Sequence, residues 1–243
     1  MNVVSYGGGT NSTAMLIGLH ERGERPDLIL FADTGGEKPH TYDHVRAVSE
    51  WGLSRGFPEI VTVRKHGITL EQDCLNRRAL PSIAYGFKSC SDHFKFRPQK
   101  AYLREHGIKP SHMLIGFDAD ESHRARRSME MSDPWAKRYP LIEWDWGRDE
   151  CEEAILRAGL PLPGKSACFF CPSSKKQEIL DLKKRYPDLM ARALAMEANA
   201  ELTAAKGLGR SFAWRDLIAW NEAQIDMFAE SPVEIDCGCY DGQ

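Results

Sequence analysis

Two cysteines separated by two residues, Cys168 and Cys171, give the chain its strongest chemical signal. This spacing lets two thiolates reach one metal ion or one iron–sulfur cluster. Pro163 and Gly164 precede the pair and Pro172 follows it, which indicates a shaped loop rather than a core strand. Zinc would suit the same soft ligands, and buried free thiols need no ligand at all, so three interpretations stay open.

A glycine-rich turn near the N-terminus is the second chemical signal. The glycines of residues 7–9 follow a β-branched run over residues 2–6 and precede a helical pattern over residues 12–20. Glycines let a ligand approach the backbone, and the first N–H groups of a helix attract phosphate. The turn matches neither a Walker loop nor the dinucleotide pattern G-x-G-x-x-G. The sequence therefore predicts a phosphate site here, with a plain capped turn as the alternative.

Several charged side chains are further candidates. Asp33 follows the apolar run 28–32, at a strand end where open α/β sheets hold ligands. An Asp that only caps the following turn is equally compatible. Asp120 precedes Arg124 and Arg127, whose guanidinium groups suit phosphate or sulfate oxygens. The alternative is a solvated, charged helix start.

The elements that must position these residues alternate along the chain. Strand-like runs cover residues 2–6, 28–32, 60–63 and 114–117, and helical patterns cover residues 12–20 and 41–51. This alternation predicts an α/β fold with a doubly wound, mostly parallel sheet. A breaker-rich segment near residues 161–164 precedes helical patterns over residues 175–205 and 212–228. We therefore predict a nucleotide-binding α/β domain over residues 1–150 and a mostly helical C-terminal region, residues 151–243, that carries the cysteine loop.

Composition excludes several classes of protein. The chain has 243 residues, is 42% hydrophobic and 28% charged, and carries a formal charge of -3, which is typical of a globular domain. The near-neutral charge gives no global attraction to nucleic acid. The apolar runs are too short to span a bilayer, and no secretory pattern is visible, so we expect no membrane partner and a cytoplasmic protein. The seven cysteines cannot all pair within one chain.

Four segments carry a resemblance to a known family. Residues 5–13 resemble the PP-loop, S-G-G-x-D-S, of the adenine nucleotide alpha-hydrolase superfamily, and the branch most similar is the phosphoadenosine phosphosulfate (PAPS) reductase-like family. Residues 31–35 resemble its D-T-G turn, residues 90–98 its C-T-x-x-x-K-x-x-P segment, and residues 115–127 its G-x-x-x-D-E-S-x-R segment. The chain departs from the PP-loop pattern at Gly7 and Asn11, where Ser and Asp are usual. Since an amide brings no charge to magnesium, Asp33 or Asp120 would have to supply that carboxylate.

The resemblance implies a set of site residues. The residues implied to bind the nucleotide are Ser5, Gly7, Gly8, Gly9, Thr10, Asn11, Ser12, Thr13, Asp33, Thr34, Lys95, Arg124 and Arg127. Catalytic roles are implied for Cys90, Asp33 and Asp120. A [4Fe–4S] cluster is implied on Cys90, Cys151, Cys168 and Cys171, with zinc as the alternative metal. Cys74 has no motif around it and is predicted to be a small core residue.

The function that we expect from these features is that of an adenylating sulfurtransferase. It would use ATP, magnesium and the cluster to place sulfur on a nucleic acid or nucleotide. The implied partners are an adenine nucleotide, tRNA or DNA as acceptor, and a cysteine desulfurase or thioredoxin-like donor; a homodimer is left open. The first alternative is a reductase that releases sulfite from PAPS or adenosine phosphosulfate (APS), because Cys237 and Cys239 loosely resemble a reductase tail. The second is a non-catalytic nucleotide- or nucleic-acid-binding module with a structural metal.

Overall fold

The fold is built on one parallel β-sheet. The computed structural model describes residues 1–81, 83–84, 87–129, 133 and 135–229. The sheet has the strand order β3 (Ile60–Val63), β2 (Leu28–Ala32), β1 (Asn2–Tyr6), β6 (His112–Ile115) and β7 (Ala136–Arg138). Every neighbouring pair in this sheet is parallel. The predicted α/β class with a parallel sheet is confirmed.

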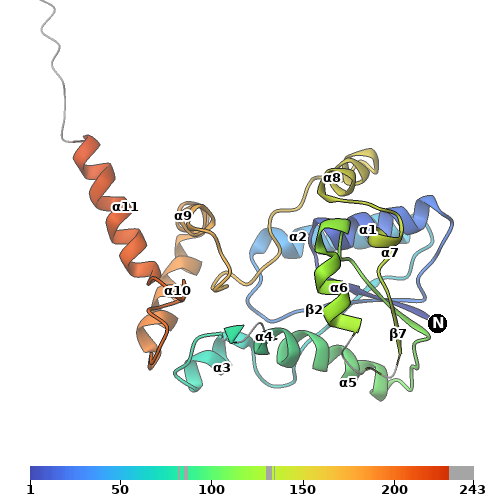
Figure 1. The fold of residues 1–243 in the computed structure, drawn as a ribbon, viewed down its shortest axis with the longest axis horizontal. Coiled ribbons are helices and arrows are strands. Elements are labelled where there is room, and N and C mark those ends of the chain that lie inside the picture. Colours follow the sequence, from blue (N-terminus) through green and yellow to red (C-terminus); the bar gives the residue numbers. More distant parts are fainter. Residues whose placement is uncertain (82, 85–86, 130–132, 134, 230–243) are drawn as a thin grey trace, which may run out of the picture.

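Helices cover both faces of the sheet, because successive side chains of a strand point to opposite sides. Val4 and Phe31 face the core beneath α1 (Thr10–Glu21), α2 (Pro39–Leu53) and α8 (Arg148–Arg157), whereas Val3 and Leu30 pack on the other side with α5 (Arg97–Glu105). Figure 1 shows α1 and α8 on one side of the sheet and α5 on the other. Because β2 is covered on both faces, all five of its residues are buried, which explains its continuous apolar run.

A second core lies beside the sheet and joins the C-terminal helices to α3 (Leu70–Asn76). These helices are α9 (Lys176–Arg185), α10 (Pro187–Asn199) and α11 (Trp214–Ala229). Phe169 and Phe170, from the cysteine loop, are buried in this core. The single helical stretch predicted over residues 175–205 is divided, because Pro187 begins α10 where α9 has just ended. The division of the chain at residue 150 stays a prediction, and α8 packs on α1 rather than on the second core.

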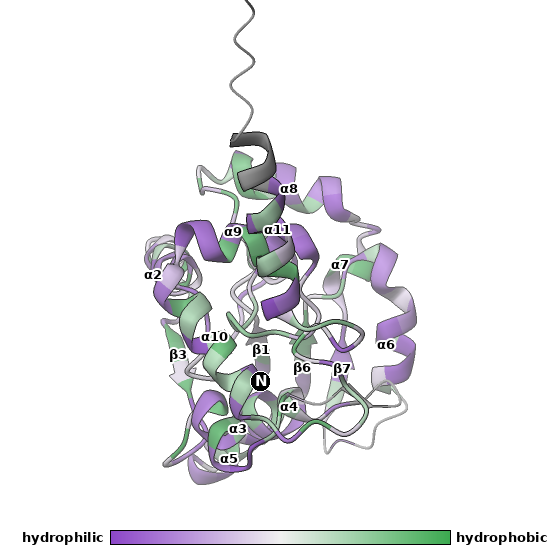
Figure 2. Ribbon diagram, turned by 90° about the vertical axis from the view of Figure 1, so that its left-hand side faces the viewer, coloured by the Kyte–Doolittle hydropathy of each residue, from purple (hydrophilic) through white to green (hydrophobic). Residues whose placement is uncertain are grey.

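The remaining elements are short and lie between the strands and helices already named. They are a hairpin of β4 (Ile83–Ala84) and β5 (Phe87–Lys88), the helical turns α4 (Ser89–Ser91), η1 (Asp92–Phe96), η2 (Ala119–Glu121) and α7 (Pro140–Glu143), and α6 (Ser122–Met129). Figure 2 shows α6 as a mostly hydrophilic helix at the side of β7. No helix among the described residues is long and apolar enough to cross a membrane.

The strand order fixes where a ligand would bind. Successive strands run outward from β1 to β2 and β3 on one side, and the chain then returns to place β6 on the other side of β1. The connections after β1 and β6 therefore diverge and leave a crevice at the carboxyl ends of these strands. In open α/β sheets this point is the usual ligand site.

Candidate nucleotide and thiol site

The turn after β1 is shaped to present backbone groups. Gly8 has φ +69, and a Cβ placed there would lie 3.1 Å from the Cγ2 atom of Thr41. Gly9 caps α1 in an extended conformation, and the Oγ atom of Ser12 accepts a hydrogen bond of 3.3 Å from its N–H. The first N–H groups of α1 have no acceptor within the helix and carry the positive end of its dipole. This arrangement suits a phosphate group.

The hydroxyl groups around the turn are bonded within the protein. The Oγ1 atom of Thr13 lies 3.0 Å from the hydroxyl of Tyr6 and 2.9 Å from Nε2 of His44. The hydroxyl of Ser5 accepts a bond of 3.0 Å from the side-chain amide of Gln99. Burial raises the pKa of Tyr6 and lowers that of His44, so both side chains are neutral near pH 7. Direct contact of Ser5 and Thr13 with a nucleotide stays a prediction.

Asn11 joins the glycine turn to the segment that follows β6. Its Nδ2 atom donates to Oδ2 of Asp118 at 2.8 Å and to Oε2 of Glu121 at 3.1 Å, while its buried Oδ1 has no hydrogen-bond partner among the described residues. The approach is close because a Cβ on Gly116 would lie 2.9 Å from Cα of Ser12. Burial, and then the charge of Glu121, raise the pKa of Asp118. Asn11 therefore donates hydrogen bonds to two carboxylates, whereas an aspartate at this position would bring a third carboxylate.

The carboxylates that meet the glycine turn are Asp118 and Glu121, not the predicted Asp120. Asp120 is exposed, whereas Asp118 is buried and lies at the turn together with Glu121. Arg124 pairs with Glu121 and lies 4.3 Å over the ring of Phe117. Two available signals were the position of Asp118 three residues after β6 and its spacing from Glu121, which is typical of an N-cap. Both predicted arginines are exposed on α6, and Arg124 is held beside Asp118 by its ion pair with Glu121 and its contact with Phe117.

Asp33, predicted to be catalytic, is fully engaged in holding the next turn. Its Oδ1 atom accepts from the N–H of Gly35 at 2.7 Å and from the hydroxyl of Tyr42 at 2.9 Å. Its Oδ2 atom accepts from Nε of Arg64 at 2.8 Å, and a second nitrogen of that guanidinium completes an ion pair. With 2% of its surface exposed, Asp33 positions the turn. A chemical role for this carboxylate stays a prediction.

A cavity of about 250 Å³ opens at the carboxyl ends of β2 and β3. Thr34, Arg64, Lys65 and Thr69 are among its lining residues, so it offers hydroxyl groups and two cations. β2 lies next to β1 in the sheet, and neighbouring strands are about 4.8 Å apart. A nucleotide with its phosphates at the glycine turn would therefore reach this cavity with its remaining groups.

The cysteine loop lies directly on the turn that follows β2. The N–H of Phe169 donates to the carbonyl of Gly36 at 2.8 Å, and Cys168 forms a β-bridge with Glu37. The Sγ atom of Cys168 lies 3.0 Å from Oγ1 of Thr34 and 4.0 Å from Oε1 of Glu37. The buried thiol of Cys168 thus contacts the D-T-G turn, although the two segments are far apart in the sequence.

A buried ion pair supports this contact. Nζ of Lys95 lies 3.2 Å from Oε1 of Glu37, whose side chain is 1% exposed. Burial alone would lower the pKa of Lys95, but Glu37 together with the Cys168 and Cys171 thiols raises it, so this lysine stays charged. Lys95 was predicted as a nucleotide ligand; it pairs with Glu37 near the thiols, and its contact with a nucleotide stays a prediction. Glu37 was not predicted, although it follows the D-T-G turn by two residues.

The cysteine loop also touches the glycine turn itself. A Cβ placed on Gly9 would lie 2.5 Å from Oγ of Ser166, two residues before Cys168. A glycine is needed at that position because Ser166 approaches so closely. The same loop segment therefore lies against both turns that border the crevice, the one after β1 and the one after β2.

Three of the four predicted cluster cysteines belong to this region, and the fourth does not. Cys168 is buried in the second core, and Cys90 packs against this core. Burial raises the pKa of Cys90, and the neighbouring Cys171 raises it further. Cys151 is fully buried in the first core, where burial raises its pKa to about 12. The predicted four-thiolate set is therefore not assembled.

No metal site is preformed in the part of the chain that the structure describes. There, no three side chains of His, Cys, Asp or Glu are close enough to hold an ion. Cys237 and Cys239, the predicted reductase tail, lie outside the described residues.

Comparisons with known proteins relate the chain to one family. The family profile described as "Phosphoadenosine phosphosulfate reductase domain" matches residues 1–162, about two thirds of the chain. A structural comparison finds the phosphoadenylyl-sulfate (PAPS) reductase of Candida auris in its phosphate complex, at a TM-score of 0.47 and 16% identity, over 69% of this chain and 80% of that one. No curated protein matches the sequence.

Proposed function

Because the chain belongs to the phosphoadenosine phosphosulfate reductase domain family, we propose that it is a PP-loop enzyme that combines an adenine nucleotide with thiol chemistry for sulfur transfer. One observation carries the proposal: the cysteine loop packs on both turns at the carboxyl ends of β1 and β2, through Ser166 at Gly9 and Cys168 at Thr34. A thiol beside bound phosphates serves a reaction in which the nucleotide is the activating or leaving group. A purely structural cysteine pair would not need that position.

In the first version of the reaction, the nucleotide is ATP. Its phosphates would lie on the backbone N–H groups that follow residues 7–9. An acceptor oxygen attacks the α-phosphorus, the bond from that phosphorus to the bridging oxygen breaks, and pyrophosphate leaves. The acceptor oxygen then carries AMP and becomes a good leaving group. Acceptors of this version are tRNA or DNA, as the resemblance implies.

Sulfur would arrive as a persulfide on one of the site thiols, supplied by a donor of the cysteine desulfurase type. Its terminal sulfur attacks the activated acceptor atom and displaces AMP. A second thiol then attacks the resulting disulfide, which releases the thiolated acceptor and leaves a protein disulfide for an external dithiol to reduce. The chemistry needs two thiols within reach, and Cys168 and Cys171 share one tight turn, closed by a hydrogen bond of 3.0 Å.

The family resemblance implies two further groups. A [4Fe–4S] cluster would be an alternative to the persulfide rather than an addition to it, because both need Cys168 and Cys171, and no three such donors among the described residues are close enough for one metal ion. Magnesium takes oxygen ligands, which Asp118, Glu121 and the unpartnered Oδ1 atom of Asn11 would provide beside the phosphates.

The second candidate is a sulfonucleotide reductase, which the family match favours. A thiolate attacks the sulfur atom of PAPS or APS, the bond from sulfur to the phosphate oxygen breaks, and the nucleotide phosphate leaves. A thioredoxin-like dithiol then attacks the Cys–S-sulfonate, so that sulfite departs and a disulfide remains. The cations Arg64 and Lys65 at the β2–β3 cavity suit a nucleotide with additional negative charge.

One experiment separates these versions. Protein purified without oxygen is incubated with ATP and magnesium in one arm, and with PAPS or APS and a dithiol in the other. The sulfurtransferase version predicts AMP and pyrophosphate in the first arm, in an amount that rises when an acceptor tRNA or DNA is added. The reductase version predicts sulfite in the second arm. Nucleotide binding without turnover in either arm would contradict both and favour the binding module.

A further inference from the structure

We propose that the two cysteines of the loop have separate tasks in sulfur transfer: Cys171 carries the sulfur, and Cys168 is the resolving thiol that later attacks Sγ of Cys171. This inference rests on the first version of the proposed function, in which two site thiols act in sequence, and it specifies which of them acts first. The assignment follows from the surroundings of the two thiols, because Cys168 is buried and Cys171 is partly exposed.

An anchored β-turn holds the two cysteines. The N–H of Cys171 donates to the carbonyl of Cys168 at 3.0 Å, and in such a turn the two Cα atoms lie less than about 7 Å apart. A disulfide needs Cα atoms roughly 4.4 to 6.8 Å apart, so the spacing of this turn is compatible with one. The two central residues, Phe169 and Phe170, are fully buried and pack edge to face in the second core, which fixes the turn.

The thiol of Cys168 is enclosed against the turn that follows β2. It is 9% exposed, and its Sγ atom contacts Oγ1 of Thr34 at 3.0 Å and Oε1 of Glu37 at 4.0 Å. Burial, followed by the carboxylate of Glu37, raises the pKa of this thiol. Since the thiolate is the attacking form, Cys168 reacts slowly with any reagent that comes from solution. A sulfur atom bonded to Cys171 lies within the same turn and needs no access from solution.

The thiol of Cys171 is the accessible one of the pair. Cys171 is partly exposed, and its Sγ atom makes no hydrogen bond within the part of the chain that the structure describes. Its backbone is held on both sides, because its N–H donates to Cys168 and its carbonyl accepts from the N–H of Ser174 at 3.0 Å. The charged Lys95 interacts with Cys171 and favours the thiolate. A persulfide donor and an acceptor, both external to the chain, can therefore reach this sulfur first.

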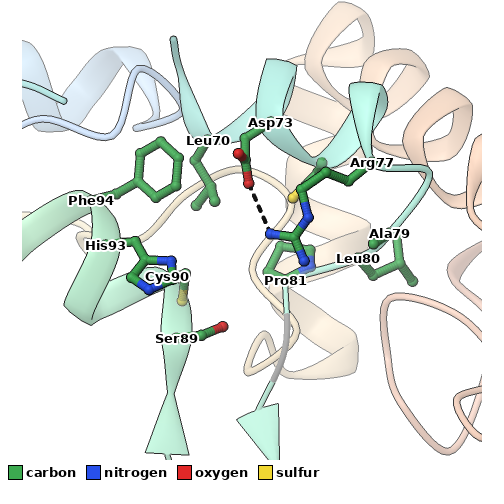
Figure 3. A pocket seen from close by; sticks show the side chains of 11 residues that line it. Leu70, Asp73, Arg77, Ala79, Leu80, Pro81, Ser89, Cys90, His93 and Phe94 are labelled. Atoms are coloured by element: carbon green, nitrogen blue, oxygen red, sulfur yellow. Dashed lines mark hydrogen bonds and ion pairs between the residues drawn. The ribbon is translucent and has the colours of Figure 1, made fainter. Parts of the chain in front are cut away.

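Cys90, the third thiol of the region, belongs to a different cavity. Figure 3 shows Cys90 beside His93 at a small cavity of about 30 Å³, and neither Cys168 nor Cys171 lines it. No hydrogen bond among the described residues joins Cys90 to the cysteine turn. Cys168, which is fixed in the same turn as Cys171, is therefore the resolving partner.

The order of the thiols defines the bonds that form and break. The Cys171 thiolate attacks the terminal sulfur of the donor's persulfide, the S–S bond of the donor breaks, and the donor keeps a thiolate. The Cys171 persulfide then attacks the activated acceptor atom and displaces AMP, which leaves a disulfide between the acceptor and Cys171. Cys168 attacks Sγ of Cys171, the bond to the acceptor's sulfur breaks, and the proton of Cys168 leaves with the thiolated acceptor. An external dithiol reduces the Cys168–Cys171 disulfide and is itself oxidised.

The test uses an aromatic disulfide that releases thionitrobenzoate, because its adduct on Cys171 stands in for the acceptor disulfide. The reduced full chain is treated with this reagent, and the product at each cysteine is identified over time by peptide mass spectrometry. The wild type is expected to pass through an adduct on Cys171 and to end with a Cys168–Cys171 disulfide. Cys168→Ser should stop at the adduct on Cys171. In Cys171→Ser, Cys168 should react several-fold more slowly than Cys171 does in the wild type.

A second trapping variant guards against a folding defect. Cys168→Ala removes the same thiol without placing a hydroxyl group in the buried contact with Thr34, and it should accumulate the same adduct on Cys171. The inference is overturned if Cys168 reacts before Cys171, if Cys171 forms its disulfide with Cys90, or if the wild type also stops at the adduct.

The reagent needs no nucleotide, so this result is separate from the test of the proposed function. A chain that shows the expected order of thiols but forms no AMP from ATP would refute the proposed sulfur transfer and leave the order of thiol reactivity standing. A chain that forms AMP but reacts first at Cys168 would refute the present inference alone.

Discussion

A pair of carboxylates and a single carboxylate border the site, and the protein compensates their charge in different ways. Asp118 and Glu121 share the neutral amide of Asn11, whereas Glu37 is held by the full charge of Lys95. The pair follows β6 in the chain, whereas Glu37 follows β2 and forms a β-bridge with Cys168. The difference shows that Asp118 and Glu121 rely on hydrogen bonds from an uncharged amide, with the exposed Arg124 beside Glu121, whereas Glu37 depends on the charge of Lys95. Variants that move one charge at a time can break or sharpen this contrast.

The largest effect is expected for Lys95→Met. This change leaves Glu37 charged, 4% exposed and without its cation, and we expect a loss of about 3 kcal/mol in the free energy of unfolding, measured with urea. That value is at the low end for a buried pair, because the Lys95 side chain is 34% exposed. The double variant with Glu37→Gln should recover most of the loss. Arg46→Met, which removes an exposed pair with Asp43, should change stability by less than about 0.5 kcal/mol.

Asn11→Asp should have the next largest effect. It replaces two hydrogen bonds by a third carboxylate beside Asp118 and Glu121, and about 2 kcal/mol of stability should be lost without a divalent cation. Magnesium in the millimolar range should restore the unfolding temperature of this variant. Asn11→Ala is the control, since it loses the same bonds without adding a charge, and magnesium should not rescue it. Equal responses of the two variants to magnesium would contradict the charge argument.

A smaller effect is expected at the contact between the glycine turn and the cysteine loop. The methyl group of Gly9→Ala would meet Oγ of Ser166 at 2.5 Å, so this hydroxyl must rotate away or the cysteine loop must shift, at a cost of about 1 kcal/mol. Alkylation of Cys168, followed by mass spectrometry, should become several-fold faster. Gly7→Ala is the matched control, because its methyl group would lie 3.7 Å from Ser12. If Gly9→Ala with Ser166→Gly stays as reactive as Gly9→Ala, the contact does not hold the loop.

The smallest effect concerns pH. Burial, followed by Glu121, raises the pKa of Asp118, so the folded state keeps a proton that the unfolded chain releases. The contribution of Asp118 to stability therefore falls as pH rises above about 4, and it is constant below that value. Asp118→Asn should flatten this part of the urea-unfolding profile, because the group that holds the proton is gone. An unchanged slope in Asp118→Asn would speak against a raised pKa at Asp118.

The buried part of the fold was readable from the sequence. The runs Leu28–Ala32 and Ile60–Val63 are strands with the predicted bounds, because continuous apolar residues suit a sheet covered on both faces. β7 escaped prediction, since Ala136–Arg138 is a three-residue edge strand without an apolar pattern. β6 begins two residues before the predicted run at Leu114, where His112 already pairs with Asn2.

The site was readable at the level of motifs but not of contacts. The glycine turn and the segment 115–121 do meet, yet the acids in contact are Asp118 and Glu121. Spacing along a chain cannot tell which of several nearby acids turns inward, because that depends on the local helix geometry.

The bridge between Glu37 and Cys168 joins positions 131 residues apart, and this separation bears on how the protein is made. Contacts between such distant segments form late, because the entropy of closing a long loop must be overcome first. On the ribosome, the glycine turn emerges well before the cysteine loop that packs on it. For the proposed function, we therefore expect a growing chain to acquire nucleotide binding first, and sulfur chemistry only when the C-terminal helices have docked.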